Sequence, residues 1–193
     1  MAESKSLRIA YGEALAELGA ENDKIVVLDA DLSNATMTNR FSAVYPDRFF
    51  DFGIAEANMA CAAAGFAHEG LIPFISTFAL FGAGRAYEQI RNSIAYVNAN
   101  VKFGFSHSGL CVGEDGGSHQ SIEDIALMRV LPNMRVLVPA DFAAAKAAIK
   151  LAAETPGPVY IRMGRASVPC VYDEDSVFEV GRAKVLREGD DVT

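Results

Sequence analysis

The chain is poor in cysteine, in clustered basic residues and in long apolar runs, and each shortage excludes a class of protein. Three cysteines, far apart among 193 residues, form neither a disulfide framework nor a zinc-site spacing. Acidic residues outnumber basic ones by 25 to 17, and Lys/Arg clusters never exceed two residues, which argues against nucleic acid as a partner. No apolar run reaches the ~18 residues of a membrane span, and the polar start at residues 1–6 lacks an apolar signal core. A cytoplasmic protein without a membrane partner is expected.

Apolar residues are plentiful, at 51%, and suffice for the core of one domain of roughly 150–200 residues. Short apolar runs typical of buried strands alternate with helical patterns. Strands are expected at 25–28, 48–52, 71–76, 101–105, 135–138 and 159–163. Helices are expected at 7–19, 39–44, 55–68, from Phe78 or Gly84 to Asn98, at 122–130, and after an Asp141 cap. This alternation predicts an α/β fold: a doubly wound, mostly parallel six-stranded sheet with helices on both faces.

Two segments depart from this simple pattern. Pro73 has no N–H group, which makes an interior position in the third strand awkward. Beyond Arg165 the chain is broken by Val168-Pro169, contains an acidic turn at 173–175, and alternates like a hairpin over 177–186. We therefore interpret residues 1–165 as the folded domain and 166–193 as a linker.

The stretch from Phe49 to Met59 combines an aromatic run, a glycine and the start of an Ala-rich helix. Gly53 allows the backbone to turn sharply out of a strand. Glu56 follows in the first helical turn, among small apolar neighbours, where the positive end of the helix favours an ionised carboxylate. The residues alone leave two functions open for Glu56, namely helix capping and proton transfer.

A polar, glycine-rich loop at 107–119 collects further reactive groups. His107 and His119 bracket it, with Glu114 and Asp115 between them. Such loops at the carboxyl edge of a parallel sheet gather functional groups, although the spacing is poor for a metal site. The structural alternative is a loop whose histidines cap helices or bind carbonyl groups.

Other candidates are equally ambiguous when taken singly. Phe78 and Phe81, which follow the third strand, suit either the core or the wall of a ligand pocket. Arg8 and Arg165 suit either an anion site or the surface.

Four stretches, in this order, resemble the pyrimidine-binding domain of transketolase. They are Gly53-Ile54-Ala55-Glu56-Ala57-Asn58-Met59, Ser76-Thr77-Phe78, Val112-Gly113-Glu114-Asp115-Gly116-Gly117-Ser118-His119-Gln120 and Leu131-Pro132-Asn133-Met134. The resemblance covers residues 6–170. It implies the fold already expected and a transferase that moves a two-carbon ketol unit between sugar phosphates.

The resemblance also implies a role for each candidate residue. Glu56 would activate the aminopyrimidine ring of thiamine diphosphate through the ring nitrogen, with Phe78 and Phe81 packed on the ring. A third aromatic residue of the family falls near Gly84, a place for a neighbour such as Tyr87. The implied sets are catalytic Glu56, His119 and His107; cofactor-binding Glu56, Phe78, Phe81 and Asp31; and substrate-binding His107, Asp115, His119, Arg165, Arg8 and Ser33.

One family motif is missing from this sequence. The Gly-Asp-Gly and later Asn that hold the diphosphate and its metal do not occur. The resemblance therefore implies a split transketolase, truncated before its carboxy-terminal domain and active only with an N-terminal, diphosphate-binding partner subunit. That partner would hold the magnesium or calcium ion, with no metal ligand in this chain, in a homodimer or heterotetramer.

Three other functions remain open beside the transketolase hypothesis. Deoxyxylulose-phosphate synthase shares the Asp-Gly-x-x-His-Gln core, and the beta subunit of a 2-oxo-acid dehydrogenase is a more distant possibility. The third alternative is a non-catalytic, dimerising binding module. The Glu114-Asp115 pair and Glu56-Ala57-Asn58-Met59 favour transketolase.

Overall fold

A computed structural model of the chain describes residues 3–173, 175–182 and 185–190, and its centre is a six-stranded sheet. The strand order is β3-β2-β4-β5-β7-β6, and every pairing in this sheet is parallel. The strands are β2 (Ile25–Asp29), β3 (Phe49–Asp51), β4 (Ile72–Phe78), β5 (Lys102–Ser106), β6 (Arg135–Leu137) and β7 (Val159–Arg162). Each expected strand is confirmed to within two residues at either end.

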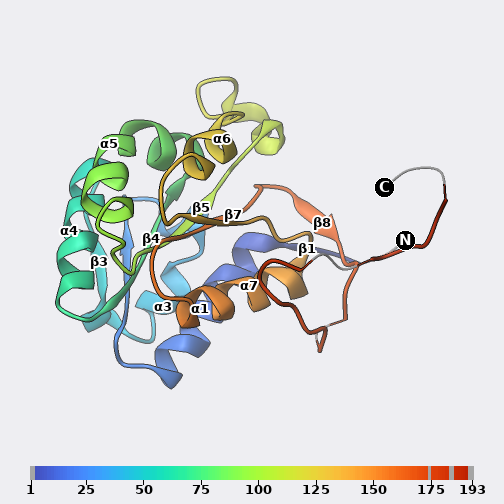
Figure 1. Ribbon diagram of the computed structural model, residues 1–193, viewed down its shortest axis with the longest axis horizontal. Coiled ribbons are helices and arrows are strands. Elements are labelled where there is room, and N and C mark those ends of the chain that lie inside the picture. Colours follow the sequence, from blue (N-terminus) through green and yellow to red (C-terminus); the bar gives the residue numbers. More distant parts are fainter. Residues whose placement is uncertain (1–2, 174, 183–184, 191–193) are drawn as a thin grey trace.

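Helices cover both faces of this sheet, as expected for a doubly wound fold (Figure 1). One face carries α1 (Leu7–Glu21), α3 (Asn39–Ser42) and α7 (Phe142–Glu154), whereas α4 (Glu56–His68), α6 (Asp124–Arg129) and the π-helix η3 (Ile90–Ala95) cover the other. Side chains of β2 alternate between the two layers, because successive residues of a strand point to opposite faces. Ile25 and Val27 join the α1 core, and Val26 and Leu28 join the α4 core.

Shorter elements fill the connections. They are α2 (Ser33–Thr36), the 3₁₀ turns η1 (Pro46–Arg48) and η4 (Leu110–Asp115), the π turn η2 (Phe81–Arg85) and α5 (Tyr87–Gln89). Asp141 caps α7, as expected, by accepting a hydrogen bond from the N–H of Ala144 at 2.9 Å. Among the described residues, no helix is both long enough and apolar enough to cross a membrane.

The prediction of a single long helix up to Asn98 is wrong in detail. Phe78 belongs to β4, and the helical segment consists of η2, α5 and η3, so that π-helical turns replace much of the α-helix. Gly82 explains part of this local geometry. A Cβ atom on Gly82 would lie 2.3 Å from the Phe105 ring, and so the backbone approaches the sheet more closely than any side chain allows.

Pro73 lies in an interior strand at no cost to the ladder. The N–H of Ile72 donates to the carbonyl of Lys24, so the next nitrogen along the strand, that of Pro73, faces β5. Pairing between β4 and β5 begins one residue later, at Phe74 and Lys102. The missing N–H group therefore falls where it has no partner strand to bond.

Helix α4 is only partly enclosed within this chain. Met59, Ala60 and Ala63 are buried against the sheet and its neighbours. Asn58 and Cys61 lie exposed on the outer side. The outer face of α4 is therefore open in this chain.

The region after Arg165 differs from the expected linker. Strand β8 (Ser167–Pro169) pairs antiparallel with β1 (Ser4–Ser6) in a second sheet that the sequence did not reveal. The Asp141 carboxylate accepts bonds from the N–H groups of Val171 and Tyr172, both at 2.7 Å. The hairpin expected over 177–186 is wrong for 177–182 and 185–186, which form no strand, and residues 183 and 184 lie outside the described residues.

Candidate functional site

The turn between β3 and α4 sets the position of Glu56. Gly53 adopts a positive φ of 63°, as expected for a glycine that redirects the chain. Oδ1 of Asp51 accepts hydrogen bonds from the N–H groups of Gly53 (2.9 Å) and Asp31 (3.0 Å), which ties the loop after β2 to this turn. Glu56 then begins α4 with only 4% of its surface exposed.

Arg85 binds the buried carboxylate. Its Nη1 lies 3.2 Å from Oε1 of Glu56, and its guanidinium carbon lies 4.1 Å from the centre of the Phe81 ring. Arg85 was not among the residues predicted for the site. The one local pattern that points to Arg85 is its spacing of four residues from Phe81, because two helical side chains at that spacing lie on one face.

Four rings from separate elements gather beside this ion pair. The imidazole of His107 stacks on Phe78 with centroids 3.7 Å apart, and Phe78 stacks on Phe81 at 5.6 Å. His119 meets the Phe81 ring edge-on at 5.1 Å. The structure thus brings both loop histidines and both predicted phenylalanines into one cluster.

Tyr87 lies elsewhere. Its hydroxyl donates to the carbonyl of Leu127 at 3.1 Å, and its ring packs against the core. No ring contact joins Tyr87 to the other described aromatic residues of the site, and the guanidinium of Arg85 lies over Phe81.

His107 occupies an unusual environment. It has a positive φ of 56° and is 3% exposed, and its Nδ1 lies 2.9 Å from the Ser106 hydroxyl. Burial lowers the pKa of His107 to about 4, and the positive charges of Arg8 and Arg165 act in the same direction. The imidazole is therefore neutral near pH 7 and available as a hydrogen-bonding group.

Two arginines from distant parts of the chain meet next to His107. Arg8 donates to the carbonyl of Ala35 at 2.6 Å and to the carbonyl of Arg165 at 3.3 Å. Arg165 forms an ion pair with the exposed Glu114. Burial, followed by the charge of Arg165, lowers the pKa of Arg8. Two arginine charges that both act on His107 suit an anionic ligand.

The remaining predicted residues lie around this centre. Asp31, exposed and with a φ of 62°, follows β2 and is linked through Asp51 to the Glu56 turn. Ser33 begins α2, and its carbonyl accepts from the hydroxyl of Thr36. Asp115 ends η4, exposed, and its negative charge raises the pKa of His107, opposing the effect of burial.

A buried ion pair that the sequence did not reveal joins α6, the helix after the glycine-rich loop, to β7. Asp124 is fully buried and accepts from Nε of Arg162 (2.8 Å) and the hydroxyl of Tyr160 (2.6 Å). At the start of the loop, the N–H and hydroxyl of Ser108 both donate to the carbonyl of Met163. The start of the loop is therefore bonded to the residue after β7, and α6, which follows the loop, is bonded to β7 itself.

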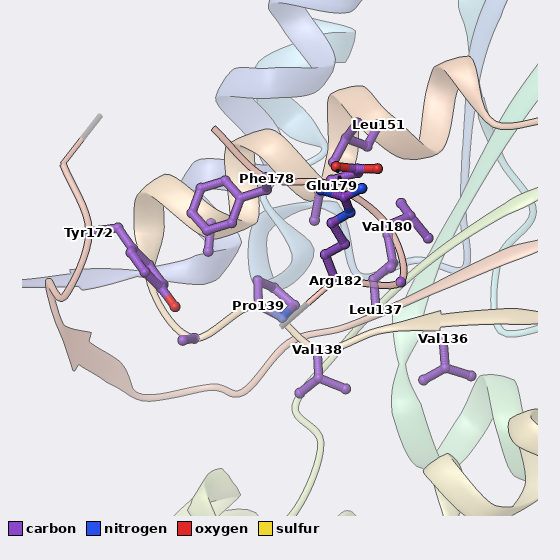
Figure 2. Close-up of a pocket in the computed structure, with 14 residues that line it drawn as sticks. Val136, Leu137, Val138, Pro139, Leu151, Tyr172, Phe178, Glu179, Val180 and Arg182 are labelled. Atoms are coloured by element: carbon purple, nitrogen blue, oxygen red, sulfur yellow. Dashed lines mark ion pairs between the residues drawn. The ribbon is translucent and has the colours of Figure 1, made fainter. Parts of the chain in front are cut away.

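A pocket of about 260 Å³ lies apart from these residues, between β6, α7 and the segment that follows β8 (Figure 2). Figure 2 shows Tyr172 and Phe178 beside Pro139, with Val136 and Leu137 from β6 among the aliphatic lining. Its lining includes none of the predicted site residues. Within the described part of the chain, no three His, Cys, Asp or Glu side chains gather as metal ligands.

Comparison with known proteins agrees with this geometry. The family model described as "Transketolase, pyrimidine binding domain" matches residues 3–171. A "putative transketolase C-terminal section" from Methanocaldococcus jannaschii is 49% identical over 98% of this chain and 60% of its own length. A 6-deoxy-6-sulfo-D-fructose transketolase subunit from Clostridium sp. strain MSTE9 is 43% identical over 97% of this chain and 58% of its own.

A solved structure described as "Split gene transketolase, inactive beta4 tetramer" has a TM-score of 0.87 and 57% identity, over 97% of this chain and 60% of that one. This chain thus spans about 60% of the length of these relatives. The match extends from β1 to β8 and includes every candidate site residue. The chain belongs to the transketolase family, as its pyrimidine-binding domain.

Proposed function

We propose that this chain is the subunit of a split transketolase that binds the aminopyrimidine ring of thiamine diphosphate. The observation that carries this proposal is the position of Glu56, a charged side chain buried at the start of α4 and joined through Arg85 to the ring of Phe81. A buried carboxylate beside a cluster of rings matches the polar and apolar contacts that an aminopyrimidine needs.

Thiamine diphosphate, when bound, supplies an acidic thiazolium carbon on which ketol transfer depends. Glu56 would bind the ring nitrogen opposite the amino group and hold or release a proton there. Phe78 and Phe81 would pack on the ring and keep water from the carboxylate. Because Glu56 is almost fully enclosed, bulk water competes weakly for this bond.

The arginine pair and the glycine-rich loop would bind the sugar substrate. Arg8 and Arg165 suit its phosphate, because guanidinium groups bind such oxyanions with two parallel bonds. His119 and the neutral His107 would contact the carbonyl oxygen and hydroxyl groups, and Asp115 would bind a hydroxyl group. Asp31 would lie beside the coenzyme and Ser33 beside the substrate channel.

The anionic end of the sugar is a separate question. One 43% identical relative is named for a sulfo-sugar. Phosphate and sulfonate both present oxygens to a guanidinium group, so parallel assays with a ketose phosphate and a sulfonated ketose would identify the preferred donor.

A partner subunit would bring the diphosphate and magnesium site. This proposal rests on the sequence, in which the family's Gly-Asp-Gly and later Asn, the motif for the diphosphate and its metal, do not occur. The relative described as an inactive β4 tetramer supports the same division of the site, because that description concerns β subunits by themselves. We infer a homodimer or heterotetramer in which the open outer face of α4 contacts another subunit.

The test is reconstitution with candidate diphosphate-binding subunits, followed by an assay of ketol transfer between pentose phosphates. We expect Glu56→Gln to reduce transfer by about two orders of magnitude or more, the scale of lost acid–base catalysis. Glu69→Gln is the matched control, because Glu69 lies exposed just beyond the other end of α4.

Circular dichroism should show the same folded content for both variants. Near-normal transfer by the Glu56→Gln complex would remove Glu56 from the mechanism. Transfer by this chain without any partner would contradict the divided site.

A further inference from the structure

Arg85 covers the solvent side of Glu56. The Glu56 side chain is 5% exposed and the Arg85 side chain is 53% exposed, so the guanidinium reaches the carboxylate from outside. The same guanidinium lies over the Phe81 ring at 4.1 Å. A ligand that approaches Glu56 and Phe81 from solvent therefore meets Arg85 first.

The chemistry of these two contacts resembles that of the expected ligand. A guanidinium group is planar, carries N–H donors and stacks on aromatic faces. An aminopyrimidine ring is also planar, can be protonated on a ring nitrogen and stacks on phenyl rings. Each would place a donor against the Glu56 carboxylate and a flat face against Phe81.

We propose that Arg85 competes with the aminopyrimidine ring of the coenzyme for Glu56 and Phe81, so that binding exchanges one planar donor for the other. This inference rests on the proposed function of Glu56. A buried carboxylate without a partner is costly, and Arg85 provides that partner until the ring displaces it.

There is space for the Arg85 side chain once the coenzyme displaces it. Arg85 is already more than half exposed, and at the neighbouring Gly84 an added Cβ would meet no atom closer than 4.0 Å. The competition is also modest in size, because the Arg85 half of the pair is more than half exposed and solvent screens its charge. We expect Arg85 to weaken coenzyme binding by about two- to fivefold, the range that such a pair corresponds to.

The experiment is calorimetric titration of thiamine diphosphate into the complex of this chain with its diphosphate-binding partner. Arg85→Ala removes the competing group, and Arg85→Gln keeps an N–H donor but removes the charge. Arg91→Ala is the control, because Arg91 is an exposed arginine that bonds its neighbour Asn92. We expect a Kd about two- to fivefold lower for Arg85→Ala, a smaller decrease for Arg85→Gln, and no change for Arg91→Ala.

A second readout is independent of turnover. Without added coenzyme, Arg85→Ala should melt at a lower temperature than the unsubstituted complex, because Glu56 loses its partner. With saturating coenzyme, the two melting temperatures should converge.

The possible failures are distinguishable. A Kd that rises or stays constant in Arg85→Ala, while Glu56→Gln still impairs binding, would overturn the competition and leave the proposed function standing. A complex that binds no coenzyme, or whose affinity is unaffected by Glu56→Gln, would overturn the proposed function and the competition with it.

Discussion

The imidazole of His107 lies on the ring of Phe78, with centroids 3.7 Å apart and planes inclined by 22°. This contact joins the end of β5 to the end of β4, and it buries a titratable ring at the centre of the proposed site. The protonation of His107 is therefore a direct reporter of the environment that the fold creates there.

We expect His107 to remain neutral until the pH falls to about 4, to which burial lowers its pKa from 6.5. The unfolded chain binds this proton near pH 6.5, whereas the folded chain does not. The free energy of unfolding should therefore fall as the pH decreases from about 6.5 to about 4. Proton NMR of the imidazole measures the pKa. The His107→Asn variant should lose this part of the pH dependence, and asparagine tolerates the positive φ of this position. An imidazole titration midpoint near 6.5 would contradict burial and show that the ring is solvated.

Gly82 and Gly84 form a matched pair for the π turn. We expect Gly82→Ala to destabilise the chain by about 1–3 kcal/mol, the usual range for overpacking, because the new Cβ would lie 2.3 Å from Phe105. Gly84→Ala should be tolerated or slightly stabilising, since Gly84 is exposed and helical. Urea unfolding measures both, and equal stabilities would contradict the close approach of η2 to β5.

Arg165 should be released for substrate when its ion pair with Glu114 is removed. We expect Glu114→Gln to lower the KM for a ketose phosphate about twofold, because an exposed pair competes weakly. Arg165→Gln should raise that KM by about tenfold or more, the scale of a lost charge-assisted bond. Steady-state kinetics of the reconstituted complex provides the values. If KM is unchanged in Arg165→Gln, the sugar phosphate binds elsewhere.

Lys102 is a buried lysine whose amine contacts three oxygens at the amino end of β5. Its Nζ donates to Oδ1 of Asn100 and to the carbonyls of Thr155 and Gly157, each at 2.6 Å. We expect Lys102→Met to destabilise the chain by about 2 kcal/mol, because carbonyl groups lose their donor. Lys24→Met, at an exposed lysine, is the control, and denaturant unfolding measures both variants.

The pH dependence of this effect has a definite sign. Burial lowers the pKa of Lys102 from 10.5 to about 7. Between these values the unfolded chain binds a proton that the folded chain does not, so this lysine stabilises the fold more as the pH rises. The stability difference between the unsubstituted chain and Lys102→Met should therefore grow from about pH 7 toward pH 10.5. A constant difference would indicate that Lys102 stays charged.

The sequence predicts the central sheet well, because each strand is a short apolar run and each connection is long enough to cross to a parallel neighbour. It also singles out Glu56 as a candidate, since a lone acid after Gly53 in an Ala-rich segment stands out locally, and the function of Glu56 stays a proposal. The ion pairs of Arg85 and Asp124 could not be predicted because their partners come from other elements. The only local signal is the spacing of Arg85 from Phe81, which indicates their contact and not the bond to Glu56. Strand β8 was missed for the same reason, as it depends on residues 4–6 at the other end of the domain.

The turns of η2 and η3 were missed for a different reason. Helical periodicity does not separate an α-helix from π turns over a few residues, and here the close packing of Gly82 on Phe105 accompanies the change. The assembly of His107, His119, Phe78 and Phe81 was expected only through the resemblance to transketolase. The side chains of these residues meet through the order of strands in the sheet, which local patterns do not specify.

The most direct measurement is the distance between the Glu56 carboxylate and the pyrimidine ring nitrogen in a crystal structure of the complex with thiamine diphosphate. We expect one Glu56 oxygen within about 3 Å of that nitrogen, the length of a hydrogen bond, and the Arg85 guanidinium moved off Phe81. A coenzyme ring bound elsewhere, with Glu56 still paired to Arg85, would contradict the assignment of this chain as the pyrimidine-binding half of the site.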